Sequence, residues 1–307
     1  MNVFLTGATG YIGGAIADAL QHTGHTMLGL AHSEKSAKVL QERSMSPLRG
    51  DLRDPASLAQ GARQADAVIH AATTNSGDMA ESDIAAVETI LAALDGTNKP
   101  FIYTSGCWVL GNSGDSIADE ESPTDPPAIV AWRPALERRI LAAAARGVRS
   151  VVIRPANVYG RAGGIPAMLI HLARQSGAAR YIGTGENHCP MVQIDDLADA
   201  YVRALIQAPA GTLVDVPGGP AVRFKEIARA ISQAAGLDGR TESWSLEAAR
   251  QFLGPLADAL ALDLQFSGAK AQRLLGWKPQ GPSIIDDLLH GSYHRGVLAS
   301  YSGLHKD

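Results

Sequence analysis

The stretch TGATGYIG at residues 6–13 follows an apolar run, NVFL at 2–5, and leads into a helix-like segment. This order predicts a strand, a glycine turn and the start of a helix. Gly7 permits the tight turn, Gly10 leaves no Cβ between the backbone and a ligand, and Gly13 lets the helix lie close to the sheet. Free N–H groups at a helix start attract phosphates. The stretch therefore predicts a dinucleotide pyrophosphate site; a purely structural turn is the alternative.

Composition narrows the class of protein. The chain has 307 residues, of which 46% are hydrophobic, so it can bury a large core in one or two domains. A net charge of −4 gives no basic surface for nucleic acid. No run approaches the roughly 18 apolar residues of a membrane span, and the early glycine motif leaves no room for a secretory signal. We therefore expect a cytoplasmic protein that binds neither nucleic acid nor a membrane.

The chain offers no metal site or disulfide framework. Its two cysteines, Cys107 and Cys189, have no partners at metal-ligand spacing, and both are most simply small apolar fillers. His290 and His294 are four residues apart, but no acidic ligand accompanies them. We expect no bound metal.

Strand and helix patterns alternate along the first half of the chain. Such alternation predicts an α/β fold with a doubly wound parallel (Rossmann) sheet. We expect a dinucleotide-binding domain over residues 1–160 and a smaller α/β, mainly substrate-binding portion over 161–307, with some elements returning to the first domain. The predicted strands are 2–5, 26–31, a short one before Gly50, 67–70, 100–104 and 151–153, and the predicted helices are 15–20, 33–43, 55–63, 81–94 and 131–145.

Several further motifs accompany the glycine turn. They are Gly50-Asp51-Leu52, His70-Ala71-Ala72, Tyr103-Thr104-Ser105, RPANVYG at 154–160, QIDDLA at 193–198 and LLGWKP at 274–279. Together they resemble the extended and atypical short-chain dehydrogenase/reductases, also called NAD-dependent epimerase/dehydratases. The likeness covers nearly the whole chain.

The resemblance implies which residues meet the cofactor. Asp51 and Leu52 would flank the adenine, 71–73 would line the middle of the cofactor, and 155–158 would touch the nicotinamide carboxamide. Asp51 could instead only cap the next helix, and the His-Ala-Ala motif could be a buried strand end. The predicted cofactor-binding residues are Gly7, Thr9, Gly10, Tyr11, Ile12, Gly13, His32, Ser33, Asp51, Leu52, Ala71, Ala72, Thr73, Thr104, Pro155, Asn157 and Val158.

The end of the second strand favours NADP(H). An NAD site places an acidic side chain there to bind the ribose 2′-hydroxyl, but this chain has Ala31, followed by His32, Ser33 and Lys35. A 2′-phosphate could be held by the Ser33 hydroxyl, helix N–H groups and the two basic side chains. NAD(H) is the alternative, in which Ser33 only caps the following helix, Lys35 is a solvated surface charge and Glu34 turns toward the ribose.

The chain departs from its relatives at the catalytic positions. Members of this superfamily usually protonate the substrate through a Tyr assisted by a Lys four residues later, with a Ser nearby. Glu137 sets a register that places Ile129 at the Tyr position and Arg133 at the Lys position. Gly106 then falls at the Ser position, with Ser105 one residue earlier. An arginine stays cationic, so Arg133 could hold the nicotinamide ribose or a substrate anion but could not shuttle protons.

Three functions are compatible with these residues. The first is an NADP(H)-dependent oxidoreductase for a small organic carbonyl or alcohol, with Ser105, Tyr159, His188 or water as the proton donor. The second is an epimerase, dehydratase or lyase that uses bound cofactor transiently, and the third is a non-catalytic NADP(H)-sensing module. We predict Ser105, Arg133 and Tyr159 as catalytic residues.

The predicted substrate contacts are Trp108, Trp132 and His188. Trp108 follows a parallel strand at its carboxyl end, where doubly wound sheets bind ligands, so it could stack on a flat substrate or only fill space. Trp132 could be packing, and His188 could be structural. The apolar stripe of the 81–94 helix is compatible with a homodimer, as in relatives, or with packing on the sheet.

Overall fold

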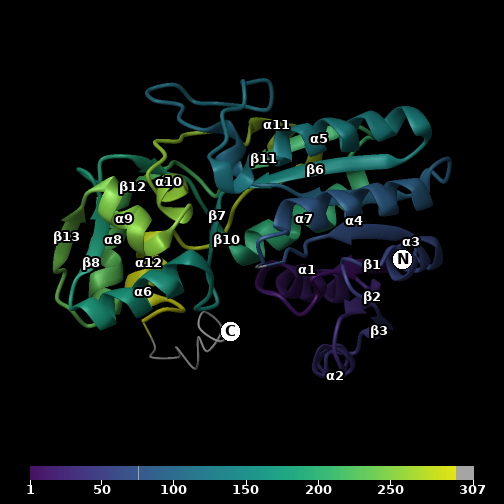
Figure 1. Cartoon of the computed structure of the whole chain (residues 1–307), viewed down its shortest axis with the longest axis horizontal. Helices are drawn as coiled ribbons and strands as arrows, with labels where there is room; N and C mark the ends of the chain where they lie inside the picture. The colour runs from purple at the N-terminus through teal and green to yellow at the C-terminus, as the bar shows by residue number, and fades with distance from the viewer. Residues whose placement is uncertain (75, 295–307) are drawn as a thin grey trace.

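The computed structural model of this chain describes residues 1–74 and 76–294 (Figure 1). Its centre is a seven-stranded sheet in the order β11-β6-β5-β4-β1-β2-β3, and every neighbouring pair in it is parallel. The α/β, doubly wound prediction is confirmed. These strands are β1 Asn2–Thr6, β2 Thr26–Ala31, β3 Ser46–Arg49, β4 Ala67–His70, β5 Pro100–Thr104, β6 Arg149–Pro155 and β11 Thr212–Val216.

Helices connect the strands and cover both faces of the sheet (Figure 1). The α-helices are α1 Tyr11–His22, α2 Glu34–Glu42, α3 Pro55–Gln64, α4 Met79–Leu94, α5 Arg133–Ala142, α6 Gly164–Ser176, α7 Ile194–Gln207, α8 Phe224–Ala234, α9 Leu246–Leu253, α10 Leu256–Leu260, α11 Ala269–Leu275 and α12 Ile284–His290. Short 3-10 helices are η1 Cys107–Leu110, η2 Ala128–Val130 and η3 Ala143–Arg146. In the described part of the chain, none of these helices combines the length and apolarity that crossing a membrane requires.

The glycine turn joins β1 to α1 as the sequence predicts. Gly7 has a φ of +76°, and a Cβ there would lie 2.7 Å from the carbonyl oxygen of Ala71. A Cβ on Gly13 would overlap the carbonyl oxygen of Gly7. Both positions therefore require glycine, because the turn and the helix start touch backbone to backbone.

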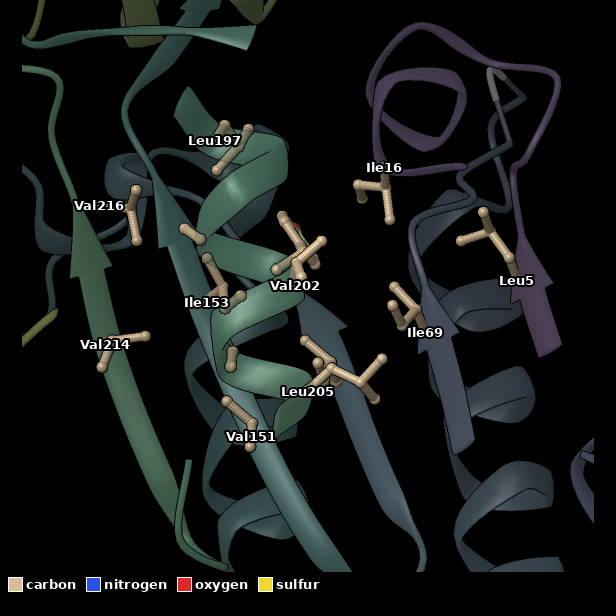
Figure 2. Packing of buried hydrophobic residues seen from close by; sticks show 14 of the residues in the cluster. Leu5, Ile16, Ile69, Val151, Ile153, Leu197, Val202, Leu205, Val214 and Val216 are labelled. Atoms are coloured by element: carbon tan, nitrogen blue, oxygen red, sulfur yellow. The ribbon is translucent and has the colours of Figure 1, made fainter. Parts of the chain in front are cut away.

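Alternation along the strands buries both faces of the sheet. Leu5 and Ile153 belong to one apolar cluster, whereas Phe4 and Val152 belong to another on the opposite face. Figure 2 shows α7 laid over the first face, with apolar side chains from the helix and the strands in one layer. That double burial explains why the strands are continuous apolar runs.

The second half of the chain contributes to both parts of the molecule. β11, α7 and α11 pack with the large sheet and its helices, and β11 is the sheet's edge strand. A third apolar cluster joins α6, α8 and α12 into the smaller part seen in Figure 1. Its short strands pair two by two: β7 Asn157–Tyr159 with β10 Met191–Gln193, β8 Ala179–Ile182 with β13 Thr241–Trp244, and β9 His188–Cys189 with β12 Val222–Arg223.

The observed helices differ slightly at their ends from the predicted ranges. The expected 131–145 helix is α5, which starts after Trp132 and tightens into η3 before Gly147, whose φ is +75°. The apolar stripe of α4 packs inside the protomer, because Val87, Ile90 and Leu94 are fully buried in the second cluster. The stripe therefore gives no independent indication of a dimer.

Candidate functional site

A cavity of about 560 Å³ lies at the carboxyl ends of β1, β2 and β4. We call it the coenzyme cavity, after the ligand that the sequence predicts. Its lining contains most of the predicted cofactor-binding residues and two that the sequence reasoning missed, Leu30 and Thr74. The lining residues are Gly7, Thr9, Gly10, Tyr11, Ile12, Gly13, Leu30, His32, Asp51, Leu52, Ala71, Ala72, Thr73 and Thr74.

The coenzyme cavity fits a dinucleotide diphosphate. The first N–H groups of a helix have no partner within the helix, and the N-cap of α1 is Gly10, which has no side chain to cap them. The first turn of α1 carries no acidic residue. An anion at this position would meet the positive end of α1 and could approach the backbone closely, because the residues there are small.

The adenosine end of the coenzyme cavity holds His32 and Asp51. Ser33 does not line the cavity, because its hydroxyl accepts the Ser36 N–H and caps α2. The Glu34 carboxylate forms an ion pair with Arg49. Glu34, the carboxylate that could serve an NAD ribose, is therefore paired with Arg49 in this structure.

A second cavity of about 270 Å³ adjoins the first, since Tyr11 and Ile12 line both. We call it the reaction cavity. Its lining is mainly apolar, with Trp108 at the position expected from the sequence. The lining residues are Tyr11, Ile12, Ser105, Gly106, Cys107, Trp108, Val130, Arg133, Pro155, Ala156, Asn157, Val158, Gly164 and Ile165.

Tyr11 joins the two parts of the molecule. Its hydroxyl donates to the carbonyl oxygen of Gly160 at 2.8 Å. A Cβ on Gly163 would overlap the Tyr11 ring, and one on Gly164 would come within 3.1 Å of it. The glycines before and at the start of α6 therefore make room for this ring.

Ser105 is buried at the end of β5 and is tied to a charged pair beneath it. Its hydroxyl donates a short hydrogen bond to Oε1 of Glu137. Arg154 donates to the same carboxylate through Nη2 at 2.6 Å and Nε at 3.1 Å. All three side chains are nearly inaccessible to solvent, so the Ser105 proton points away from the cavity.

Arg133 lines the reaction cavity from the first turn of α5. Its Nη1 donates to the carbonyl oxygen of Thr104 at 3.1 Å, and its guanidinium carbon lies 5.5 Å from the Trp132 ring centroid. Its Nε is buried and has no hydrogen-bond partner among the residues that the structure describes. Thr104 itself is not among the lining residues, and its hydroxyl accepts from Tyr201.

Asp83 holds the start of α5 from below. Its carboxylate accepts from Trp132 Nε1 at 2.8 Å and Tyr103 Oη at 2.6 Å, and it pairs with His70 Nε2 at 3.1 Å. Burial favours a higher pKa for Asp83, but the hydrogen bond and charge of His70, with the charge of Arg133, lower its pKa overall. Trp132, predicted as a substrate contact, is thus fixed to Asp83 and does not line the reaction cavity.

Two other predicted site residues lie away from both cavities. Tyr159 is buried, its hydroxyl donates to the carbonyl oxygen of Pro282 at 2.6 Å, and burial raises its pKa. His188 donates its backbone N–H to Oδ1 of Asp263 at 2.7 Å, and its ring Nδ1 lies 2.9 Å from the same oxygen. The structure therefore gives both side chains partners in the second half of the chain.

Sequence reasoning also missed contributors to the reaction cavity. Val130, rather than Ile129, faces it, together with Ile165 from the start of α6. Cys107 lines it as well, and burial raises its pKa well above the usual value. The available signal for the buried pair was Arg154, a charged residue near the end of an apolar strand, whereas Glu137 stands beside two other charged residues of α5.

Comparisons with known proteins agree with this geometry. The model of the NAD dependent epimerase/dehydratase family matches residues 3–216. An uncharacterised protein of Schizosaccharomyces pombe is 34% identical over 95% of this chain and 100% of its own length. The 2-alkyl-3-oxoalkanoate reductase of Stenotrophomonas maltophilia is 27% identical over 77% of this chain and 76% of its own.

A solved structure shares the fold. The UDP-glucose 4-epimerase of Thermus thermophilus, in complex with NAD, superposes with a TM-score of 0.79 at 20% identity, covering 97% of this chain and 100% of that one. The glycine turn, the sheet order and the family match lead to one conclusion. The chain belongs to the NAD-dependent epimerase/dehydratase family of extended short-chain dehydrogenase/reductases, and it is an NAD(P)-dependent oxidoreductase.

Proposed function

We propose that the protein is an NADP(H)-dependent oxidoreductase that moves a hydride to or from the carbonyl carbon of a small, largely apolar molecule. The observation that carries this proposal is the pair of adjoining cavities that share Tyr11 and Ile12. One cavity offers glycine backbone and a helix start to a diphosphate. The other offers an apolar space, at the end of the sheet where such folds bind ligands.

The preference for NADP(H) rests on the adenosine end. His32 faces the coenzyme cavity, and the Glu34 carboxylate is held by Arg49. A 2′-phosphate would therefore meet a histidine beside the start of α2, where the one first-turn carboxylate, Glu34, is paired with Arg49.

The bound nicotinamide would supply or accept the hydride. This chain's residues orient the substrate, with Trp108 along the apolar wall and Arg133 as the cation that faces it. Ser105 donates to Glu137, and Tyr159 and His188 lie outside the cavity. We therefore assign the proton to water.

The apolar lining supports a lipophilic substrate rather than a sugar nucleotide. The lining of the reaction cavity includes one permanently charged side chain, Arg133. The Stenotrophomonas relative is named as a reductase of 2-alkyl-3-oxoalkanoates, which carry a ketone, an alkyl branch and a carboxylate. An apolar ketone or aldehyde is the corresponding proposal for this protein.

The test is a pair of titrations followed by turnover. We expect NADPH to bind at least about tenfold tighter than NADH by fluorescence. With a panel of apolar ketones and aldehydes, we expect the absorbance of the reduced nicotinamide to fall as alcohol forms. Product without a net absorbance change would identify an epimerase or lyase instead, and coenzyme binding without turnover would identify a sensing module. No affinity for either coenzyme would overturn the proposal.

A homodimer through α4 and α5 is a secondary part of the proposal. The two helices are joined within the protomer by an exposed ion pair, Arg139 with Glu88, at 2.7 Å. Analytical ultracentrifugation of the wild-type protein and Arg139→Glu tests whether this surface joins two copies.

A further inference from the structure

Among the described residues Arg133 forms no ion pair, and the carboxylate of Asp83 acts on it only at longer range. Its hydrogen bond goes to a neutral carbonyl, that of Thr104, and its other contact is the Trp132 ring. Among residues 1–74 and 76–294, no carboxylate lies within 4 Å of its side-chain nitrogens. The side chain nevertheless lines a cavity whose other walls are mainly apolar.

The nearby acids already serve other groups. Asp83 accepts from Trp132 and Tyr103 and pairs with His70. Glu137 binds Arg154 and Ser105. Neither carboxylate can turn to Arg133 without leaving a buried donor unpaired, which is unfavourable.

Arg154, which is buried, shows how this protein neutralises an arginine inside the chain. Two nitrogens of Arg154 bind Glu137, and Nη1 lies 3.8 Å from Asp215. Arg154 is therefore neutralised inside the chain, whereas Arg133 faces a cavity. A half-buried cation in apolar surroundings is stable only when an anion or water meets it.

We infer that Arg133 binds a carboxylate on the substrate, so that the substrate class is an apolar carbonyl compound bearing an acid group. The planar guanidinium matches a carboxylate in two parallel hydrogen bonds. The coenzyme diphosphate is expected at the start of α1, in the other cavity. This inference rests on the proposed function and names its substrate class.

Matched acids and amides test the inference. The probes are cinnamate, octanoate and indole-3-acetate, each paired with its neutral amide, titrated by calorimetry into the full chain saturated with NADP⁺. We expect at least one acid to bind about tenfold or more tighter than its amide, the difference typical of a charged hydrogen bond. We expect Arg133→Gln to abolish that difference and Arg133→Lys to retain part of it.

Arg138→Gln is the matched control, since Arg138 is exposed on the same helix and its loss changes the net charge equally. The control should keep the wild-type discrimination. Equal affinity for every acid and its amide, no binding of any acid, or discrimination that survives Arg133→Gln would overturn the inference. If Arg133→Gln weakens NADP⁺ and leaves the discrimination intact, Arg133 serves the coenzyme instead. Failure of wild-type protein to bind NADP⁺ would count against the proposed function itself.

Discussion

The coenzyme cavity and the reaction cavity share a wall, yet they are made of different parts of the chain. The first is lined largely by backbone and small residues of one glycine turn and the ends of neighbouring strands. The second is lined by side chains from β1–α1, β5, α5, β6 and α6, supported from below by Glu137, Arg154 and Asp83. Short motifs can encode the first, whereas only the folded chain assembles the second.

The largest expected effect lies beneath the reaction cavity. Glu137→Ala leaves Arg154 buried without its main partner, so we expect a loss of about 3–5 kcal/mol in the free energy of unfolding, measured with urea. Arg250→Ala, which breaks an exposed pair with Asp258 away from α4 and α5, should cost much less. Equal losses in the two variants would mean that the buried pair does not support the reaction cavity.

The next effect concerns the coenzyme cavity. Gly13→Ala forces a methyl group into the Gly7 carbonyl, which costs about 1–3 kcal/mol and moves the helix start. We expect NADPH affinity to fall about tenfold to a hundredfold in a fluorescence titration. Gly77→Ala is the control, because a Cβ there meets nothing within 4 Å. An unchanged NADPH affinity in Gly13→Ala would contradict the proposal that the backbone of the glycine turn holds the coenzyme diphosphate.

A smaller effect is expected at the adenosine end. His32→Glu places a carboxylate where NAD sites carry one, so NADPH should lose its advantage over NADH by about tenfold or more, roughly 1.4 kcal/mol. Gln41→Glu adds the same charge at an exposed position near the end of α2 and should leave the ratio of the two affinities unchanged. A ratio that is the same in wild-type and His32→Glu protein would remove His32 from coenzyme selection.

The smallest effect concerns the link between the two parts. Asp18 in α1 binds Arg43 at 2.6 Å and Arg161, beyond β7, at 2.6 Å. Burial favours a higher pKa, but hydrogen bonds from Arg161 and Arg43 lower the pKa of Asp18 overall. Because the folded pKa is depressed, this stabilisation is present above the ordinary value of about 3.9 and is lost as the pH falls through the folded pKa.

Asp18→Asn should therefore be less stable than wild type at neutral pH, by no more than about 1 kcal/mol because the groups are partly exposed. Thermal unfolding of both proteins between pH 2 and 7 measures the difference. It should shrink below about pH 4. A difference that persists unchanged in acid would show that the carboxylate charge is not its cause.

The fold could be predicted because periodicity and glycine turns are local signals. TGATGYIG, the apolar strands and the alternation with helices gave the doubly wound sheet. The lining of the coenzyme cavity could also be predicted, because most of its residues lie at the ends of predicted strands. Ser33 was the exception, because a hydroxyl that caps a helix cannot be distinguished by sequence from one that faces a ligand.

The lining of the reaction cavity was harder to predict, because the positions of its side chains depend on contacts between residues far apart in the sequence. The sequence predicts Trp132 as a substrate contact, but its indole N–H donates to Asp83, which lies on another helix. His188 is paired with Asp263, and Tyr159 with Pro282. No pattern within one segment predicts such partners. Trp108 lies where the sequence predicts it, at the carboxyl end of the sheet, because it follows β5 closely in the chain.

Tyr11 has a consequence for the order in which ligands associate. Its ring packs against Gly163, and its hydroxyl donates to the carbonyl oxygen of Gly160. The same side chain lines both the coenzyme cavity and the reaction cavity. A dinucleotide that settles on α1 thus fixes one side of the neighbouring chamber before anything enters it. The small molecule should accordingly arrive second and depart first, which steady-state inhibition patterns would report as compulsory sequential kinetics.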